Sequence, residues 1–261
     1  MDKRLQDYSW SAPGGYVAIL LEEVWKSFKG NTVLRGVDLR VPRGSVYVLA
    51  GPNGSGKTTT IRTILGLYRR DRGRILVLGC DPEDSCWREV VRRTGYLPED
   101  ASPYERLTGY ENILFYAKLH AEGDPRRIKE LVERAVDISG LSRSELHKRA
   151  GAYSKGMKRR LLLATSLMHN PELVVLDEPT SGLDVFSQHA IRRLIRSLAQ
   201  EGRTILVTTH NLLEAELIAD YVGFIYKGTI VYEGPVHEAI KKFNASNLEE
   251  AFIRCIDSMG R

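Results

Sequence analysis

Residues 51–58 constrain the fold of this chain more than any other feature of its sequence. They match the pattern G-x-x-x-x-G-K-[ST] throughout. In order they are Gly51, Pro52, Asn53, Gly54, Ser55, Gly56, Lys57 and Thr58. An apolar segment typical of a strand, residues 45–50, precedes them, and a segment typical of a helix, residues 57–67, follows. This order of strand, glycine loop and helix predicts an α/β fold.

The residue types in this loop suit a phosphate group. Glycines let backbone N–H groups turn towards phosphate oxygens, the Lys57 ammonium reaches β- and γ-phosphates, and the Thr58 hydroxyl is a hard ligand for Mg²⁺. A plain glycine turn is the alternative, but the full pattern arises by chance in only about one chain in a hundred of this length. The loop therefore predicts a site for a nucleoside triphosphate with Mg²⁺.

Two acidic residues end a second apolar strand, residues 173–176. A continuous apolar run is typical of a central parallel strand, whose carboxyl end opens on a ligand site. An acidic pair alone is usually a solvated turn; after a phosphate loop, Asp177 is expected to hold Mg²⁺ through its water shell and Glu178 to polarise the attacking water. His210 follows the strand expected at residues 204–208, where it is either structural or bonded to the γ-phosphate.

The middle of the chain, residues 100–165, has helical patterns instead of alternating elements. Three helix starts are expected there: Thr108 with Glu111 as a capping box, Asp124 followed by proline, and Ser142 with Glu145. Further strands are expected at residues 17–21, 33–41, 75–78, 96–97, 222–226 and 229–233, and further helices at residues 185–200, 211–219, 235–243 and 247–257. Lys227 and Gly228 form a hairpin signal between two of the strands.

Residues 153–160, YSKGMKRR, place four cations around Ser154 and Gly156 before an apolar run. They indicate a helix start, where free N–H groups and the helix dipole favour an anion. A solvated basic helix end is the alternative.

Composition adds limits. Apolar residues make up 43% of the 261, enough for a packed core, and Lys plus Arg exceed Asp plus Glu by only 38 to 33, so no nucleic-acid partner is expected. No apolar run approaches the ~18 residues of a membrane span, so a soluble, unexported chain is expected. The cysteines, Cys80, Cys86 and Cys255, are expected to be ordinary thiols in a reducing compartment.

In these motifs and their order the chain resembles the nucleotide-binding subunit of ATP-binding cassette transporters over about residues 17–234. The order is residues 51–59, residues 95–98 opening the helical insert, residues 153–157, residues 177–180, residues 181–184 and His210. The resemblance implies a P-loop NTPase core with a mixed or parallel sheet, an N-terminal antiparallel β subdomain and an inserted α-helical subdomain. It also implies ATP and Mg²⁺ as ligands, with Thr59 added to the phosphate loop.

The resemblance further implies that two subunits sandwich two ATP molecules head to tail. Ser154 and the Gly156 backbone would then bind the γ-phosphate held by the partner, and Asp184 would lie in the loop that crosses between subunits. Phe28 matches the residue that stacks on adenine, with a core position as the alternative.

Three residues depart from the family pattern: Lys155 and Met157 in the signature, and Glu99 where glutamine is usual. We expect Glu99 to coordinate Mg²⁺ in the closed dimer; the alternative is that it points to solvent while Asp100 or a water takes the place of the amide.

The resemblance thus implies an ATPase subunit that powers a membrane transporter, similar to the cassettes of ABC-2 type exporters, on the cytoplasmic face of the cell membrane. The partners expected are a second ATP-binding subunit, in a homodimer, and an integral membrane permease. The domains expected are a flexible extension over residues 1–15, the ATPase over residues 16–234 and a helical tail over residues 235–261. The alternatives are a soluble cassette ATPase such as an iron-sulfur assembly scaffold, a cassette acting on DNA or ribosomes, and a degenerate nucleotide binder.

Overall fold

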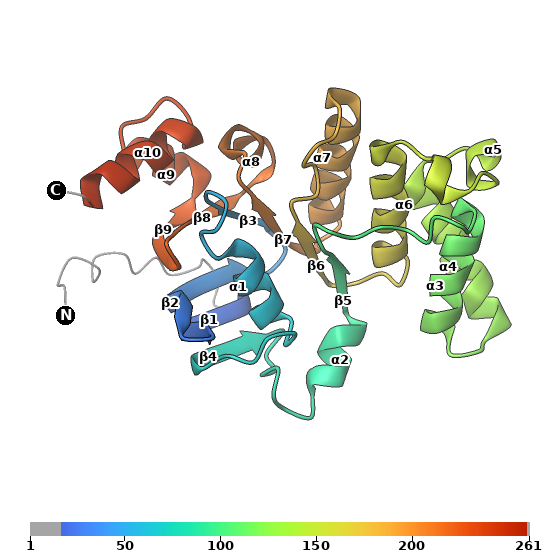
Figure 1. The fold of residues 1–261 in the computed structure, drawn as a ribbon, viewed down its shortest axis with the longest axis horizontal. Helices are drawn as coiled ribbons and strands as arrows, with labels where there is room; N and C mark the ends of the chain where they lie inside the picture. Colours follow the sequence, from blue (N-terminus) through green and yellow to red (C-terminus); the bar gives the residue numbers. More distant parts are fainter. Residues whose placement is uncertain (1–16, 260–261) are drawn as a thin grey trace. The chain divides into compact units, whose positions relative to one another are not determined.

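The computed structural model describes residues 17–259 and divides into two compact units (Figure 1). Among the described residues, the first unit comprises residues 17–92 and 195–259, and the second comprises residues 93–194. The extension expected over residues 1–15 lies outside the described residues.

The first unit holds two sets of strands. Its strands are β1 (Val17–Phe28), β2 (Asn31–Pro42), β3 (Val46–Ala50), β4 (Arg72–Val77), β7 (Thr204–Thr209), β8 (Tyr221–Tyr226) and β9 (Thr229–Pro235). Its helices are α1 (Lys57–Ile64), α2 (Trp87–Arg92), α8 (Leu212–Ile218), α9 (Val236–Lys242) and α10 (Leu248–Met259). β1 pairs antiparallel with both β2 and β4, and β3 pairs parallel with β7 and β8. The unit therefore has an antiparallel β part beside a mainly parallel one.

Burial explains the place of β3. All five of its residues are buried and all are apolar or aromatic, so both faces of the strand need cover, as for a central parallel strand. β8 and β9 pair antiparallel through the turn at Lys227 and Gly228, whose φ angles are 48° and 81°. The predicted hairpin is confirmed.

The second unit is mostly helical. Its elements are β5 (Thr94–Leu97), α3 (Gly109–Ala121), α4 (Pro125–Ser139), α5 (Arg143–Leu146), a 3₁₀ turn at Ala150–Ala152, α6 (Lys155–Leu167) and β6 (Leu173–Asp177); α7 (Val185–Gln200) begins in this unit and ends in the first. β5 and β6 pair parallel. The helices share an apolar core that includes Ile113, Leu131, Leu161 and Met168.

Local capping sets the helix starts. Thr108 caps α3 and Ser142 caps α5, each in a complete capping box with the glutamate three residues later, and Asp124 caps α4 before its proline. Ser154 caps α6, so the helix start predicted there is also confirmed.

One expectation needs correction, and one helix was missed. Cys80 and Cys86 form a disulfide, with their Cα atoms 6.1 Å apart, so the prediction of ordinary thiols is wrong for this pair. The turn after β4 and the start of α2 bring the two residues within bonding reach, which the sequence spacing did not indicate. Cys255 is a buried free thiol. Helix α2 itself was not predicted.

A partly buried carboxyl group links three strands of the first unit. Glu233 on β9 accepts hydrogen bonds from the Arg40 backbone N–H of β2, at 2.7 Å, and from the Tyr47 hydroxyl of β3, at 2.9 Å. Desolvation is the largest cause that raises the pKa of Glu233, to about 7. Its ionisation therefore opposes folding near neutral pH.

Candidate functional site

The phosphate loop lies between β3 and α1, as predicted. Gly51 passes so close to β8 that a Cβ atom there would lie 2.2 Å from the Ile225 carbonyl oxygen. Gly56 caps α1 with a φ of 111°, in the left-handed region that favours glycine. A larger residue at position 51 or 56 would therefore require the backbone to shift.

Lys57 and Ser55 direct polar groups into this loop. The Lys57 ammonium, which is buried, donates to the Gly51 carbonyl at 2.8 Å and to the Pro52 carbonyl at 3.2 Å. The Ser55 hydroxyl is buried and has no hydrogen-bond partner among the described residues. A phosphate oxygen in the loop would supply that partner, so the loop fits the ligand for which its sequence is typical.

His210 lies next to the phosphate loop in the backbone register. Ala50 pairs with Thr209 across the parallel strands β3 and β7, and the Gly51 N–H donates to the Thr209 carbonyl at 3.3 Å. Gly51 and His210 each follow the end of one of these neighbouring strands, so the two residues lie side by side. His210 is exposed, directly before the Asn211 cap of α8.

Phe28 ends β1 and is 37% exposed, so the core alternative for this residue is wrong. Its ring meets Tyr68 edge to face with the centroids 5.1 Å apart, and the Lys26 ammonium lies 5.2 Å from its centroid. An aromatic ring that is partly exposed can stack on a base.

In the second unit, Asp177 ends β6 and Glu178 follows it directly, and both are buried. Glu178 has a φ of 46°, a conformation that costs a non-glycine residue about 1 kcal/mol or more. Backbone outliers of this kind cluster at functional sites, where the surrounding structure holds them in place.

Arg159 on α6 holds this strand end, and the sequence analysis missed it. Its guanidinium donates to the carbonyls of Pro98 at 3.2 Å, Glu99 at 3.4 Å and Glu178 at 3.2 Å. Burial lowers the pKa of Arg159, and the Glu99 and Asp177 carboxylates oppose that shift. The one signal in the sequence is that Arg159 lies three residues after Gly156, a spacing that places both on one side of a helix.

Arg159 thus joins the segment after β5 to the segment after β6. The Glu99 side chain itself is exposed, and its backbone carbonyl is the group that bonds Arg159. The structure therefore brings Glu99, Asp177 and Glu178 together around one arginine. Which ligand the Glu99 carboxylate meets stays a prediction.

The cations of the signature are mostly engaged within the protein. Lys158 pairs with Glu105, Arg159 bonds the carbonyls described above, and Arg160 donates to the Gly140 carbonyl at 3.2 Å. The Ser154 hydroxyl accepts from the Met157 N–H at 3.2 Å. The N-terminus of α6 also attracts an anion through its backbone N–H groups, beside the charge of these side chains.

Asp184 precedes α7 and caps it. Its carboxylate accepts from the Ser187 N–H at 3.0 Å and from the Ser187 hydroxyl at 2.7 Å. These bonds lower the pKa of Asp184. Asp184 is exposed, and the next two residues, Val185 and Phe186, are exposed apolar side chains.

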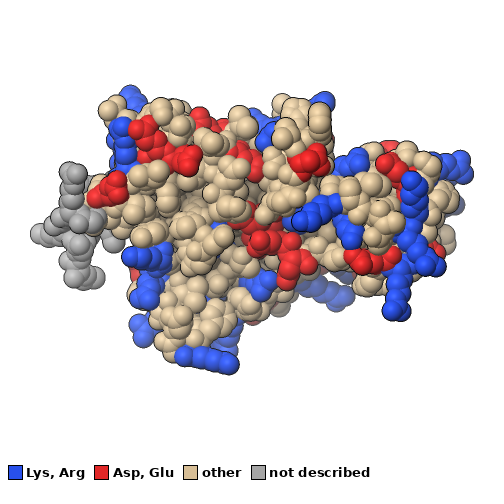
Figure 2. All heavy atoms as spheres, turned by 45° about the horizontal axis from the view of Figure 1, so that its top comes forward, with Lys and Arg blue, Asp and Glu red and all other residues tan. Residues whose placement is uncertain are grey.

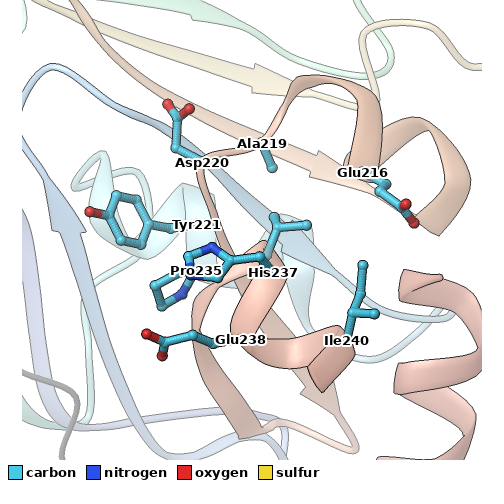
Figure 3. A pocket seen from close by; sticks show the side chains of 9 residues that line it. Glu216, Ala219, Asp220, Tyr221, Pro235, His237, Glu238 and Ile240 are labelled. Atoms are coloured by element: carbon cyan, nitrogen blue, oxygen red, sulfur yellow. The ribbon is translucent and has the colours of Figure 1, made fainter. Parts of the chain in front are cut away.

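A separate pocket of about 650 Å³ lies in the first unit, away from the phosphate loop (Figure 3). Two of its three acidic residues serve the fold: Asp220 accepts from Arg196 at 2.9 Å and from the Val46 N–H at 2.8 Å, and Glu216 accepts from the Leu248 N–H at 2.8 Å. This pocket offers no phosphate-binding group of the kind found at the loop.

Comparison with known proteins agrees with the motifs. The ABC transporter family model matches residues 34–181. The lantibiotic transport ATP-binding protein SrtF of Streptococcus pyogenes is 34% identical over 89% of this chain and 94% of its own. The bacitracin transport ATP-binding protein BcrA of Bacillus licheniformis is 41% identical over 82% of this chain and 68% of its own.

Solved structures agree as well. An ATP-binding subunit of an ABC transporter superposes with a TM-score of 0.78 at 27% identity, over 92% of this chain and 99% of its own. The ADP conformation of the cassette MJ1267 superposes with a TM-score of 0.76 at 26% identity, over 91% and 99%. The predicted resemblance and fold class are confirmed: the chain belongs to the ABC transporter family, as an ATP-binding cassette.

Proposed function

We propose that this chain hydrolyses ATP to power export through a membrane permease. The observation that carries the proposal is the phosphate loop, which has an unpartnered serine hydroxyl between β3 and α1 and a buried lysine at the start of α1. Relatives whose names refer to lantibiotic transport, bacitracin transport and daunorubicin resistance support the export direction.

ATP would bind with its phosphates on the loop and its adenine on Phe28. Backbone N–H groups of the loop, the Lys57 ammonium and the hydroxyls of Ser55 and Thr59 would contact the phosphate oxygens. The partly open ring of Phe28, in the same unit as the loop, supports the adenine assignment.

The residues also fit Mg²⁺. The Thr58 hydroxyl and the Asp177 carboxylate are hard oxygen donors, with Glu99 as the proposed third. Among residues 17–259 no group of three or more His, Cys, Asp or Glu could hold a metal ion by itself. This suits Mg²⁺, which takes few protein ligands and completes its shell with water and phosphate oxygens. When bound, the ion would neutralise charge on the phosphates.

Glu178 is the proposed general base. Its carboxylate would accept a proton from the water that attacks the γ-phosphate, and His210 would bond the γ-phosphate and orient that water. The unusual backbone of Glu178, with its carbonyl bonded to Arg159, supports the assignment because it fixes where the side chain leaves the chain.

A second copy of the chain would complete the site. Ser154 and the Gly156 backbone, at the N-terminus of α6, would bind the γ-phosphate of ATP held by the partner, with Asp184 beside them. The dimeric cassette MJ0796, 25% identical with a TM-score of 0.73 over 83% of this chain, supports the arrangement. We propose a homodimer.

The membrane permease would dock on the helical part of the second unit, on the cytoplasmic side of the membrane. Tyr104, Tyr110, Phe115 and Leu119 are exposed there, and Tyr104 and Phe115 pack edge to face at 5.1 Å. Within residues 17–259, no helix is long and apolar enough to cross a membrane. Figure 2 shows both Lys and Arg side chains and Asp and Glu side chains on the face that it draws.

The test is Glu178→Gln beside wild type and Lys57→Ala. We expect Glu178→Gln to bind ATP, to lose steady-state turnover by two orders of magnitude or more, about 10²–10⁴-fold for a general base, and to accumulate an ATP-bound dimer. Lys57→Ala should lose ATP binding itself. Normal turnover in Glu178→Gln would refute the assignment of the base.

The exposed carboxylate of Glu133, on α4, provides the control: Glu133→Gln should behave as wild type. Purification of wild type from membranes should also bring down an integral membrane protein. Recovery instead with iron-sulfur assembly proteins would favour the scaffold alternative.

A further inference from the structure

Two segments of the proposed dimer site touch each other inside the second unit. Gly156, in the first turn of α6, is buried. A Cβ atom built on it would lie 2.2 Å from the Ser187 hydroxyl oxygen and 3.0 Å from the Ser187 Cβ. The first turn of α7 therefore rests against the first turn of α6 (both helices are labelled in Figure 1), and only glycine at residue 156 permits the contact.

Ser187 cannot easily turn aside. Its hydroxyl donates to one carboxylate oxygen of Asp184 at 2.7 Å while its N–H donates to the other at 3.0 Å. Rotating the hydroxyl away from residue 156 would break the first bond, and the Ser187 Cβ would stay where it is. The Ser187 side chain is therefore held between its hydrogen bond to Asp184 and its contact with Gly156.

The charges of this corner explain why that orientation matters. Both α6 and α7 present N-terminal N–H groups, and each terminus attracts negative charge. The nearest anion is the Asp184 carboxylate, one oxygen of which lies 3.7 Å from the Cβ position of Gly156. Because the Asp184 carboxylate accepts hydrogen bonds from Ser187 at the start of α7, it does not occupy the N–H groups at the start of α6. Those groups can then bind another anion.

We infer that Ser187 is a positioning residue for the ATP site, which it serves by holding Asp184 on α7 and setting the distance between α7 and the Gly156 backbone. The inference rests on the proposed function, because the ligand at the α6 N-terminus is the γ-phosphate of the partner's ATP. Ser187 itself touches no phosphate. It sets the position of two groups that do their work at the dimer interface.

A double-mutant cycle tests the contact. Gly156→Ala should lower ATPase activity about tenfold or more, because the new methyl displaces Ser187 and Asp184, while ATP binding to the monomer stays unchanged. Ser187→Gly alone should cost a few-fold. In the double variant Gly156→Ala/Ser187→Gly the methyl has room, so we expect activity to return to within about threefold of Ser187→Gly alone, a coupling typical of residues in contact.

Ser197→Gly is the matched control, since Ser197 is an exposed serine further along α7. Combined with Gly156→Ala it should restore nothing. The inference is overturned if the losses of Gly156→Ala and Ser187→Gly simply multiply, or if Ser197→Gly rescues equally well.

The same cycle followed by melting temperature needs no nucleotide. Non-additive melting temperatures with non-additive ATPase support the inference, whereas additive melting temperatures would refute the contact even if ATPase were absent. An inactive wild-type protein would instead refute the proposed function, so the two failures are distinguishable.

Discussion

At the scale of single residues, Glu99 is the departure with the clearest chemical consequence. A carboxylate near Mg²⁺ attracts the metal but repels the γ-phosphate. If Glu99 binds Mg²⁺ in the closed dimer, Glu99→Gln should keep most ATPase activity with a higher Mg²⁺ requirement, and Glu99→Ala should lose much more. The measurement is ATPase rate across Mg²⁺ concentration. Identical curves for wild type and both variants would show that Glu99 never meets the metal.

Glu233 makes a second prediction at this scale. Its pKa is about 7 when folded against an ordinary 4.5, so the folded state holds the proton over that range while the unfolded state has lost it. Stability should therefore be greatest below pH 4.5, as far as this group is concerned, and should fall as pH rises to about 7. Allowing for solvent screening at this partly buried group, the free energy of unfolding should fall by about 2 kcal/mol over this range.

Glu233→Gln should remove this dependence, because a neutral amide oxygen can still accept from the Arg40 N–H and from the Tyr47 hydroxyl. Denaturant unfolding at pH 5, 6, 7 and 8 measures it. Glu249→Gln, an exposed change on α10, is the control and should keep the wild-type slope. An unchanged slope in Glu233→Gln would contradict the assignment.

At the scale of elements, the disulfide fastens the segment between β4 and α2. Cys80 is fixed by the turn after β4, where the Val77 N–H donates to its carbonyl at 2.8 Å, and Cys86 lies directly before α2. Within the closed segment, Asp81 forms a bidentate pair with Arg70, at 2.9 and 3.0 Å. A loop this short should contribute about 2 kcal/mol by restricting the unfolded chain.

Reduction should therefore lower the free energy of unfolding by about that amount, measured by denaturant unfolding with and without a dithiol. Cys86→Ser should start at the lower value and show no response to the dithiol. Equal stability of oxidised and reduced wild type, with the bond verified by mass, would contradict this estimate.

The elements also show what the sequence could predict. The starts of α3, α4, α5 and α6 follow from capping side chains that act within three residues, so local sequence is sufficient for them. The contacts of Arg159 could not be predicted from local sequence, because its acceptors lie 61, 60 and 19 residues away in the chain. Ser187 was missed for the same reason, because its proposed role depends on its contact with Gly156 in another helix.

At the scale of the whole molecule, the head-to-tail dimer predicts complementation. Lys57→Ala and Ser154→Arg subunits should each be inactive as homodimers. A mixed dimer has one site with both its phosphate loop and its signature intact, while the other site has lost both. Mixing at equal amounts should thus restore about a quarter of wild-type ATPase, since half the dimers are mixed and each has one working site of two.

The control is to mix two inactive proteins that damage the same segment, Lys57→Ala with Thr58→Ala, which should restore nothing. If the first pair shows no recovery at any ratio, the shared site is unsupported unless both sites must act together. Recovery in the control pair would show that the gain on mixing does not come from one intact pair of phosphate loop and signature, and would contradict the shared site.

With Cys80 and Cys86 bonded, the buried Cys255 is the one remaining thiol of the three in the sequence, all of which lie within the described residues. It lies on α10 with its sulfur 3.8 Å from the Val231 carbonyl oxygen of β9, and burial raises its pKa to about 11. Since only the thiolate reacts, Cys255 should be doubly protected in the folded protein. The rate at which the Cys255 thiol is alkylated should therefore report how often α10 opens from the sheet. The measurement needs no engineered cysteine or label.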